Sequence, residues 1–228
     1  MTILKEAAQL ASQRLGSSVE SITIERVVVG LFFTGVKLSN SAAGICYTPT
    51  KEIPQAVCCP SSAGRIFDPV RVRGDSVDKV LSALDSREPI KTAIALAALN
   101  ALSATCWERG LTGGYTIRER VDAQDVVRMP PGTSVAVVGA FVPTLKKLKA
   151  RGGDWWVIEQ DPRSLKDEEL AHYVPADRAE AVIREADVLI VTGVTLVNHT
   201  LEPILAAARP GAEIAVMGPT AGLLPEPL

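Results

Sequence analysis

The polar residues best placed for chemistry follow four short, apolar, β-branched runs in the second half of the chain. In a parallel sheet, ligands bind outside the carboxyl ends of the strands, where the following loops converge. We therefore predict a ligand site made of residues that come after these runs: Gly139, Phe141, Pro143, Glu159, Thr192, Thr195, Asn198, Gly218 and Thr220.

The segment 192–200 is the most informative part of this set. Its threonines, Asn198 and His199 precede a predicted helix that begins near Leu201, so hydroxyl, amide and backbone N–H groups can surround a small anionic or polar ligand. The alternative is that Asn198 or Thr200 only caps that helix. His199 is a candidate proton carrier or metal ligand, and its alternative role is that of a surface or capping residue.

Glu159 lies at the end of the strand predicted after Gly139. An acidic residue at this place binds ribose hydroxyls in nucleotide-binding sheets. The alternatives are a solvated carboxylate or a helix-cap partner. The segment that begins at Gly139 lacks the G-x-G-x-x-G pattern, so an ordinary NAD site is disfavoured.

The soft metal donors are few and irregularly spaced. Cys58 and Cys59 are adjacent in a segment rich in Pro, Ser and Gly, and together with His199 they are the candidate metal ligands. Cys106 lies in a nearly all-apolar segment and is predicted to be part of the core. The four cysteines form no C-x-x-C pair, so a structural zinc site is not indicated and all four are interpreted as reduced thiols.

Composition limits the class of protein. The 228 residues are 47% hydrophobic, 22% charged and 4% aromatic, which is typical of a soluble α/β protein. The net charge of −2 gives no excess of cations to bind a nucleic-acid backbone. The most apolar stretch, 94–105, is too short to span a bilayer, and the first residues do not resemble a signal peptide, so we expect a cytoplasmic protein.

The elements that must position these residues fall into two groups. An amphipathic helix over 3–15, an antiparallel meander within 22–48 and an apolar helix over 88–109 predict an α+β domain. Strands then alternate with helices from residue 134 onward, which predicts a parallel sheet. We predict an α+β domain over 1–112, a linker over 113–132 and a Rossmann-like domain over 133–228.

Several segments carry a family resemblance: Val29–Leu38 with Gly44–Pro49, Asn100–Ser103, Val138–Pro143, Ala186–Asn198 and Met217–Ala221. In these segments the chain resembles the uncharacterised family described as "putative heavy-metal chelation". The resemblance implies an N-terminal domain shaped like that of enolase and a C-terminal Rossmann-like domain. It also implies a ligand site in the cleft between the two domains.

Three functions follow from these observations. The first is a cytoplasmic protein that binds a small ligand, a metal chelator or a metal complex in the interdomain cleft. The second is an enzyme with an adenosyl or nucleotide cofactor, such as a transferase, in which Glu159 binds the ribose. The third is a metal chaperone that uses Cys58 and Cys59. A transition metal or a nucleotide-like molecule is thus the expected ligand; nucleic acid and membranes are not expected partners, and a symmetric homodimer is the expected assembly.

Overall fold

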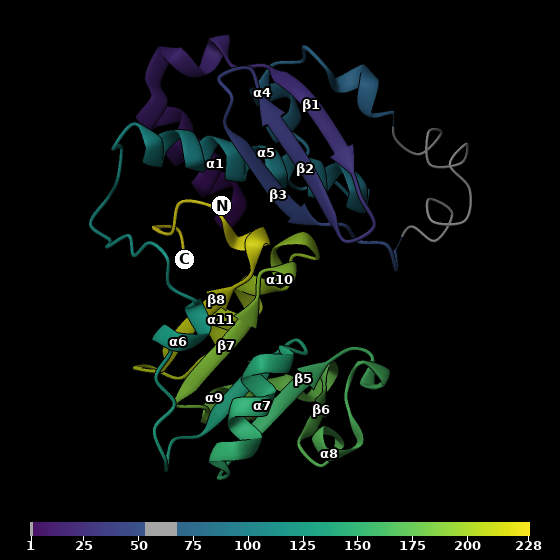
Figure 1. The fold of residues 1–228 in the computed structure, drawn as a ribbon, viewed down its shortest axis with the longest axis vertical. Helices are drawn as coiled ribbons and strands as arrows, with labels where there is room; N and C mark the ends of the chain where they lie inside the picture. The colour runs from purple at the N-terminus through teal and green to yellow at the C-terminus, as the bar shows by residue number, and fades with distance from the viewer. Residues whose placement is uncertain (1, 53–67) are drawn as a thin grey trace. The chain divides into compact units, whose positions relative to one another are not determined.

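A computed structural model describes residues 2–52 and 68–228 (Figure 1). The chain forms two compact units. The first contains Met1–Thr116, Leu196–His199 and Gly218–Leu228, and the second contains Ile117–Thr195 and Thr200–Met217. The last eleven residues therefore pack with the N-terminal elements and not with the strands that precede them in sequence.

The first unit is an antiparallel sheet with helices. Its elements are α1 (Ile3–Leu15), β1 (Ile24–Val29), β2 (Phe33–Leu38), β3 (Ala43–Tyr47), α4 (Val77–Leu81) and α5 (Pro89–Glu108), with 3-10 turns at Gly16–Ser21, Pro69–Val72 and Pro219–Ala221. The sheet order is β1-β2-β3. This confirms the predicted opening helix, meander and apolar helix.

Helix α5 is the centre of the first unit. It begins at Pro89, whose missing backbone N–H costs nothing because an N–H in the first turn has no partner within the helix. Most of the side chains of α5 are fully buried. A Cβ atom on Gly44 of β3 would overlap the Ala97 oxygen and the Ala101 nitrogen of α5 and would lie 2.9 Å from the carbonyl carbon of Asn100. The helix and strand backbones therefore touch at Gly44, and only glycine allows this approach.

Helix α5 is also long and apolar enough to cross a membrane by length and composition alone. This differs from the expectation that the apolar stretch is too short, because the helix extends beyond residues 94–105 at both ends. Within the first unit, 83% of its apolar window is buried by other parts of the protein. That is the environment of a core helix and is compatible with a soluble protein.

The second unit is built on a parallel sheet. Its elements are α6 (Ala123–Val126), β4 (Val135–Val138), α7 (Val142–Arg151), β5 (Trp155–Glu159), α8 (Asp167–Leu170), β6 (Tyr173–Pro175), α9 (Ala179–Glu185), β7 (Val188–Thr192), α10 (Val194–Val197, which extends into the first unit), α11 (Leu201–Ala207) and β8 (Glu213–Met217), with 3-10 turns at Pro162–Ser164 and Ala176–Arg178. The strand order is β6-β5-β4-β7-β8, and all pairs are parallel. The predicted parallel sheet is confirmed, whereas β6 was not predicted because it is only three residues long.

Alternate side chains of the strands form the core on which α7 packs. The buried cluster joins residues of β4, β5 and β7 to Leu145 and Leu148 of α7. Helix α7 ends at Gly152, whose φ of 71° lies in the left-handed region. Helix α7 is thereby held against the sheet, and its first turn follows directly after the carboxyl end of β4.

Ser134 and Asp187 join the amino ends of β4 and β7. The Asp187 carboxylate accepts hydrogen bonds from the Ser134 N–H (2.7 Å) and hydroxyl (2.9 Å), and it pairs with Arg209 at 2.7 Å. The hydrogen bonds from Ser134, with the Arg209 charge adding to them, hold the pKa of Asp187 below its ordinary value.

We predict that Asp187→Asn lowers the melting temperature at neutral pH and that the difference from wild type shrinks in acid. A lowered folded-state pKa contributes stability above the unfolded pKa of about 3.9, and this is lost as pH falls through the folded pKa. Thermal unfolding of both proteins from pH 7 to pH 3 measures the effect. A difference in melting temperature that stays constant over this range would contradict the assignment.

Candidate functional site

The carboxyl ends of β4 and β7 lie at the point where the strand order of the parallel sheet reverses. Gly139 follows β4 with a φ of 100°, and a Cβ there would lie 3.0 Å from Cγ2 of Thr192 at the end of β7. The backbone conformation favours glycine, and any larger residue would also require the Thr192 side chain to shift. At such a reversal the loops after the two strands run apart and leave room for a ligand.

The turn after β7 uses its own hydroxyl groups. The Thr192 hydroxyl accepts a hydrogen bond from the Val194 N–H at 3.3 Å, and the Thr195 hydroxyl donates to the Thr192 carbonyl at 2.6 Å. Thr195 is buried, while Thr192 is partly exposed. Of the two predicted threonines, Thr192 is therefore the one whose side chain is accessible from outside, and Thr195 shapes the turn.

The first turn of α7 lies directly after Gly139. Phe141 is the N-cap residue, and no side chain caps this end of the helix. Pro143 occupies the first turn, and the ring of Phe141 packs against the core of the second unit. An uncapped helix start presents backbone N–H groups and a partial positive charge, which together suit an anion. Val142 at this start is 53% exposed, so the position is open to solvent.

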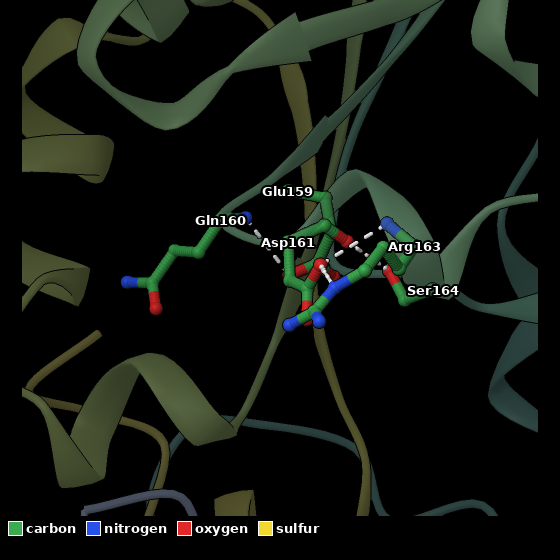
Figure 2. A network of polar contacts seen from close by, with 5 residues as sticks. All are labelled: Glu159, Gln160, Asp161, Arg163 and Ser164. Carbon is green, nitrogen blue, oxygen red and sulfur yellow. Dashed lines mark hydrogen bonds and ion pairs between the residues drawn. The ribbon is translucent and has the colours of Figure 1, made fainter.

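Glu159 ends β5, the strand next to β4, and lies in a small polar network (Figure 2). One of its carboxylate oxygens, Oε1, accepts a hydrogen bond from the Gln160 N–H at 2.8 Å. Within the same loop, Nε of Arg163 donates a hydrogen bond to the Asp161 carboxylate at 2.8 Å, and the Ser164 hydroxyl donates to the Asp161 carbonyl at 2.7 Å. The loop is thus closed by its own side chains, and Oε2 of Glu159 has no partner among the described residues.

The remaining predicted ligand residues belong to the first unit. Asn198 and His199 are exposed after α10, and His199 has a φ of 57°, a left-handed conformation unusual for a residue with a side chain. Gly218 is exposed with a φ of 103°. The structure therefore assigns Asn198, His199, Gly218 and Thr220 to one unit and the other predicted residues to the second.

Thr220 has a clear structural partner. Its side chain is buried, and its hydroxyl oxygen accepts a hydrogen bond from the Tyr47 N–H of β3 at 3.0 Å. Its carbonyl accepts from the Asn100 side chain at 3.0 Å. These two bonds fix the segment after β8 against the outer edge of the three-stranded sheet.

Asn100 is a structural residue to which the sequence analysis assigned no role. From the middle of α5 its Nδ2 also donates to the Ile45 carbonyl at 2.8 Å, so one amide holds both β3 and the C-terminal segment. One turn further along the helix, the Ser103 hydroxyl accepts from the Leu224 N–H at 3.1 Å. The signal available in the sequence was a polar amide inside an otherwise apolar helix.

The described residues do not fit a resident metal ion held by protein side chains. Cys58 and Cys59 lie outside the described residues. Within the described part of the chain no three His, Cys, Asp or Glu side chains come together. Cys46 and Cys106 are buried, and burial raises the pKa of the Cys46 thiol to about 12, so this thiol is protonated at neutral pH.

We predict that Thr220→Val lowers the free energy of unfolding by about 1–3 kcal/mol, since it leaves the partly buried Tyr47 N–H without its acceptor. Thr220→Ser keeps the hydroxyl and serves as the matched control, with a smaller loss. Urea unfolding of the three proteins measures the difference. If Thr220→Val unfolds at the same urea concentration as wild type, the structural role of this hydroxyl is wrong.

Comparison with known proteins agrees with this architecture. Two family models, both described as "Putative heavy-metal chelation", match residues 12–103 and residues 122–228. An uncharacterised protein of Methanocaldococcus jannaschii is 27% identical over 153 residues, which are 66% of this chain. The match spans 55% of the length of that protein, so this chain corresponds to about half of it.

Two solved structures share the fold. A protein of unknown function from Pyrococcus horikoshii has a TM-score of 0.73 at 21% identity, covering 100% of this chain and 82% of that one. A protein of unknown function from Desulfitobacterium hafniense has a TM-score of 0.69 at 19% identity, covering 95% of this chain and 80% of that one. Both are similar in fold, and at these identities the similarity does not extend to activity.

Proposed function

Because the chain belongs to the family described as "putative heavy-metal chelation", we propose that it binds a small anionic chelator, or the metal complex of one, at the carboxyl ends of β4 and β7. The observation that carries the proposal is Gly139. Gly139 has a left-handed backbone conformation and lies close to the Thr192 side chain, where the strand order reverses. The uncapped start of α7 follows it directly in sequence.

The chemistry of this place favours an oxygen-rich anion. Chelators of metal ions carry carboxylate or other anionic oxygens, and such oxygens accept hydrogen bonds from the N–H groups of a helix start. The partly exposed Thr192 hydroxyl is 3.3 Å from a backbone N–H at the same edge and adds a second polar group. In this proposal the metal is cargo, held by the donors of the small molecule.

The finer features of the fold are part of the same proposal. The strands β4, β5, β6, β7 and β8 stand in the order 3-2-1-4-5 when numbered along the chain, which is the order of dinucleotide-binding sheets and supports a Rossmann-like second unit. The three-stranded meander followed by α5 supports an enolase-like first unit. The location of the ligand between two domains and the cytoplasmic location stay predictions.

The test introduces a negative charge at the start of α7. We predict that Val142→Asp weakens binding of citrate, alone and as its zinc complex, by about tenfold or more, because two anions then compete for the helix start. Val142→Asn is the matched neutral control and should retain affinity. Isothermal titration measures binding. An acidic residue in a first turn also stabilises a helix, so the melting temperature of Val142→Asp should not fall.

Equal citrate affinity in wild type and Val142→Asp would show that the anion does not bind at α7. Native mass spectrometry of the gently purified protein, compared with its denatured mass, gives an independent result. If the native mass equals the bare chain and neither citrate nor zinc citrate binds, the proposed function is wrong.

A second candidate function is supported by Glu159. This carboxylate ends the strand next to β4 and keeps Oε2 without a partner among the described residues, which is the place of a ribose-binding acid in a sheet of this order. The ligand would then be a nucleotide or an adenosyl compound, and the chain an enzyme such as a transferase.

We predict for this alternative that S-adenosylmethionine or ATP binds and that Glu159→Gln weakens binding by about tenfold, since one charged acceptor of the ribose hydroxyls is lost. Asp161→Asn in the same loop is the control for a general loss of negative charge. Titration calorimetry with both compounds decides the question. No heat with either of them would exclude the nucleotide alternative and would leave the chelator proposal unaffected.

A further inference from the structure

The three-stranded sheet has one face that α5 does not cover, and this open face is apolar. Register pairs Val28 with Gly35 and Gly35 with Ile45, and strand alternation puts Phe33 and Lys37 on the same face. Val28 is 56% exposed, Phe33 45% and Ile45 42%, while α5 passes behind the sheet in Figure 1. In the turn that joins β1 to β2, Leu31 and Phe32 are exposed as well.

Gly35 at the centre of the open face has no local reason to be glycine. Its φ is not in the left-handed region, and a Cβ would lie at an ordinary 3.8 Å from Cγ2 of Ile45. Gly44, in contrast, is required by its contact with α5. A glycine in a strand interior weakens the strand, and the isolated sheet does not explain this cost. The missing side chain leaves room at the centre of the open face for side chains of a body that packs on this side of the sheet.

The residues of β2 on this face are complementary to themselves. Phe33, Gly35 and Lys37 follow one another along the open face, and Arg26 is paired with Lys37 in the register. A two-fold axis that passes beside Gly35, at right angles to the strands, puts the aromatic end of one copy opposite the cationic end of the other. Cations bind the faces of aromatic rings, and Glu25, which pairs with Lys37 at 2.8 Å, limits the excess charge.

We propose that the open face binds the open face of a second copy of this chain in a symmetric, isologous dimer. The exposed apolar area is close to the apolar share of such an interface. An aromatic side chain has an accessible surface of about 150–250 Å², and an aliphatic one has somewhat less. At their exposed fractions, the accessible apolar surface on the order of 500 Å² comes from five side chains: Val28, Leu31, Phe32, Phe33 and Ile45. A stable interface needs about 800 Å² from each partner, of which about 65% is apolar in homodimers.

Sedimentation of the full chain tests the dimer. Wild type at micromolar concentration should sediment at twice the 24.2 kDa of one chain. Val28→Lys and Phe33→Lys, which put like charges opposite one another in the two copies, should each weaken the dimer by about tenfold or more and give monomers. Val121→Lys, an equally exposed valine in the second unit, is the matched control and should remain dimeric. Circular dichroism checks that every variant is folded.

Crosslinking tests the position of the axis. In a Cys58→Ser, Cys59→Ser background, Val28→Cys, which is paired with Gly35 and lies on the proposed axis, should be joined to its copy by a bis-maleimide that spans about 10 Å, the spacing of stacked sheets. Ala43→Cys, at the far end of the same face, should not be joined. A monomeric wild type, a dimer that both charged variants retain, or crosslinking through Ala43→Cys alone would each overturn the proposal.

Discussion

Backbone contact between α5 and β3 at Gly44 is the constraint on which the first unit depends. Without a side chain at this position the helix lies directly on the strand, and Asn100 comes within reach of the Ile45 carbonyl at the strand edge. The same amide then reaches the carbonyl of Thr220, so the final segment of the chain is held where a fourth strand would otherwise pair. An edge strand with unpaired backbone groups invites aggregation, and here a side chain and a turn cover it.

The second unit depends on the pairing of β4 with β7. The two strands are neighbours although β5 and β6 lie between them in sequence, and a Cβ on Gly139 after β4 would lie 3.0 Å from the Thr192 side chain at the end of β7. The reversal of strand order follows from this pairing. The uncapped start of α7 and the partly exposed Thr192 then lie at the same edge. Backbone N–H groups, a partial positive charge and a hydroxyl group suit the anion of the proposed function.

The two units differ in how they use polar residues. In the first unit Thr220, Asn100 and Ser103 are buried and form hydrogen bonds with backbone groups, so these side chains stabilise the fold. In the second unit the carboxyl edge keeps partly exposed groups at Thr192 and Glu159. Thr192 and Thr220, at the carboxyl ends of neighbouring strands, thus have different roles, and the difference is whether a backbone N–H from a distant element reaches the hydroxyl.

The sequence by itself determined the mixed α/β fold class and the longer helices and strands, because apolar periodicity and β-branched runs are local properties that the packed chain keeps. It also located Gly139, Glu159 and Thr192 at strand ends, since a strand end can be read from the residues around it. Only the tertiary structure decided that Thr220 binds Tyr47, that Asn100 joins two distant carbonyls and that residues 218–228 return to the first unit. These contacts join residues more than fifty positions apart, and no local pattern encodes which distant backbone group a side chain will meet.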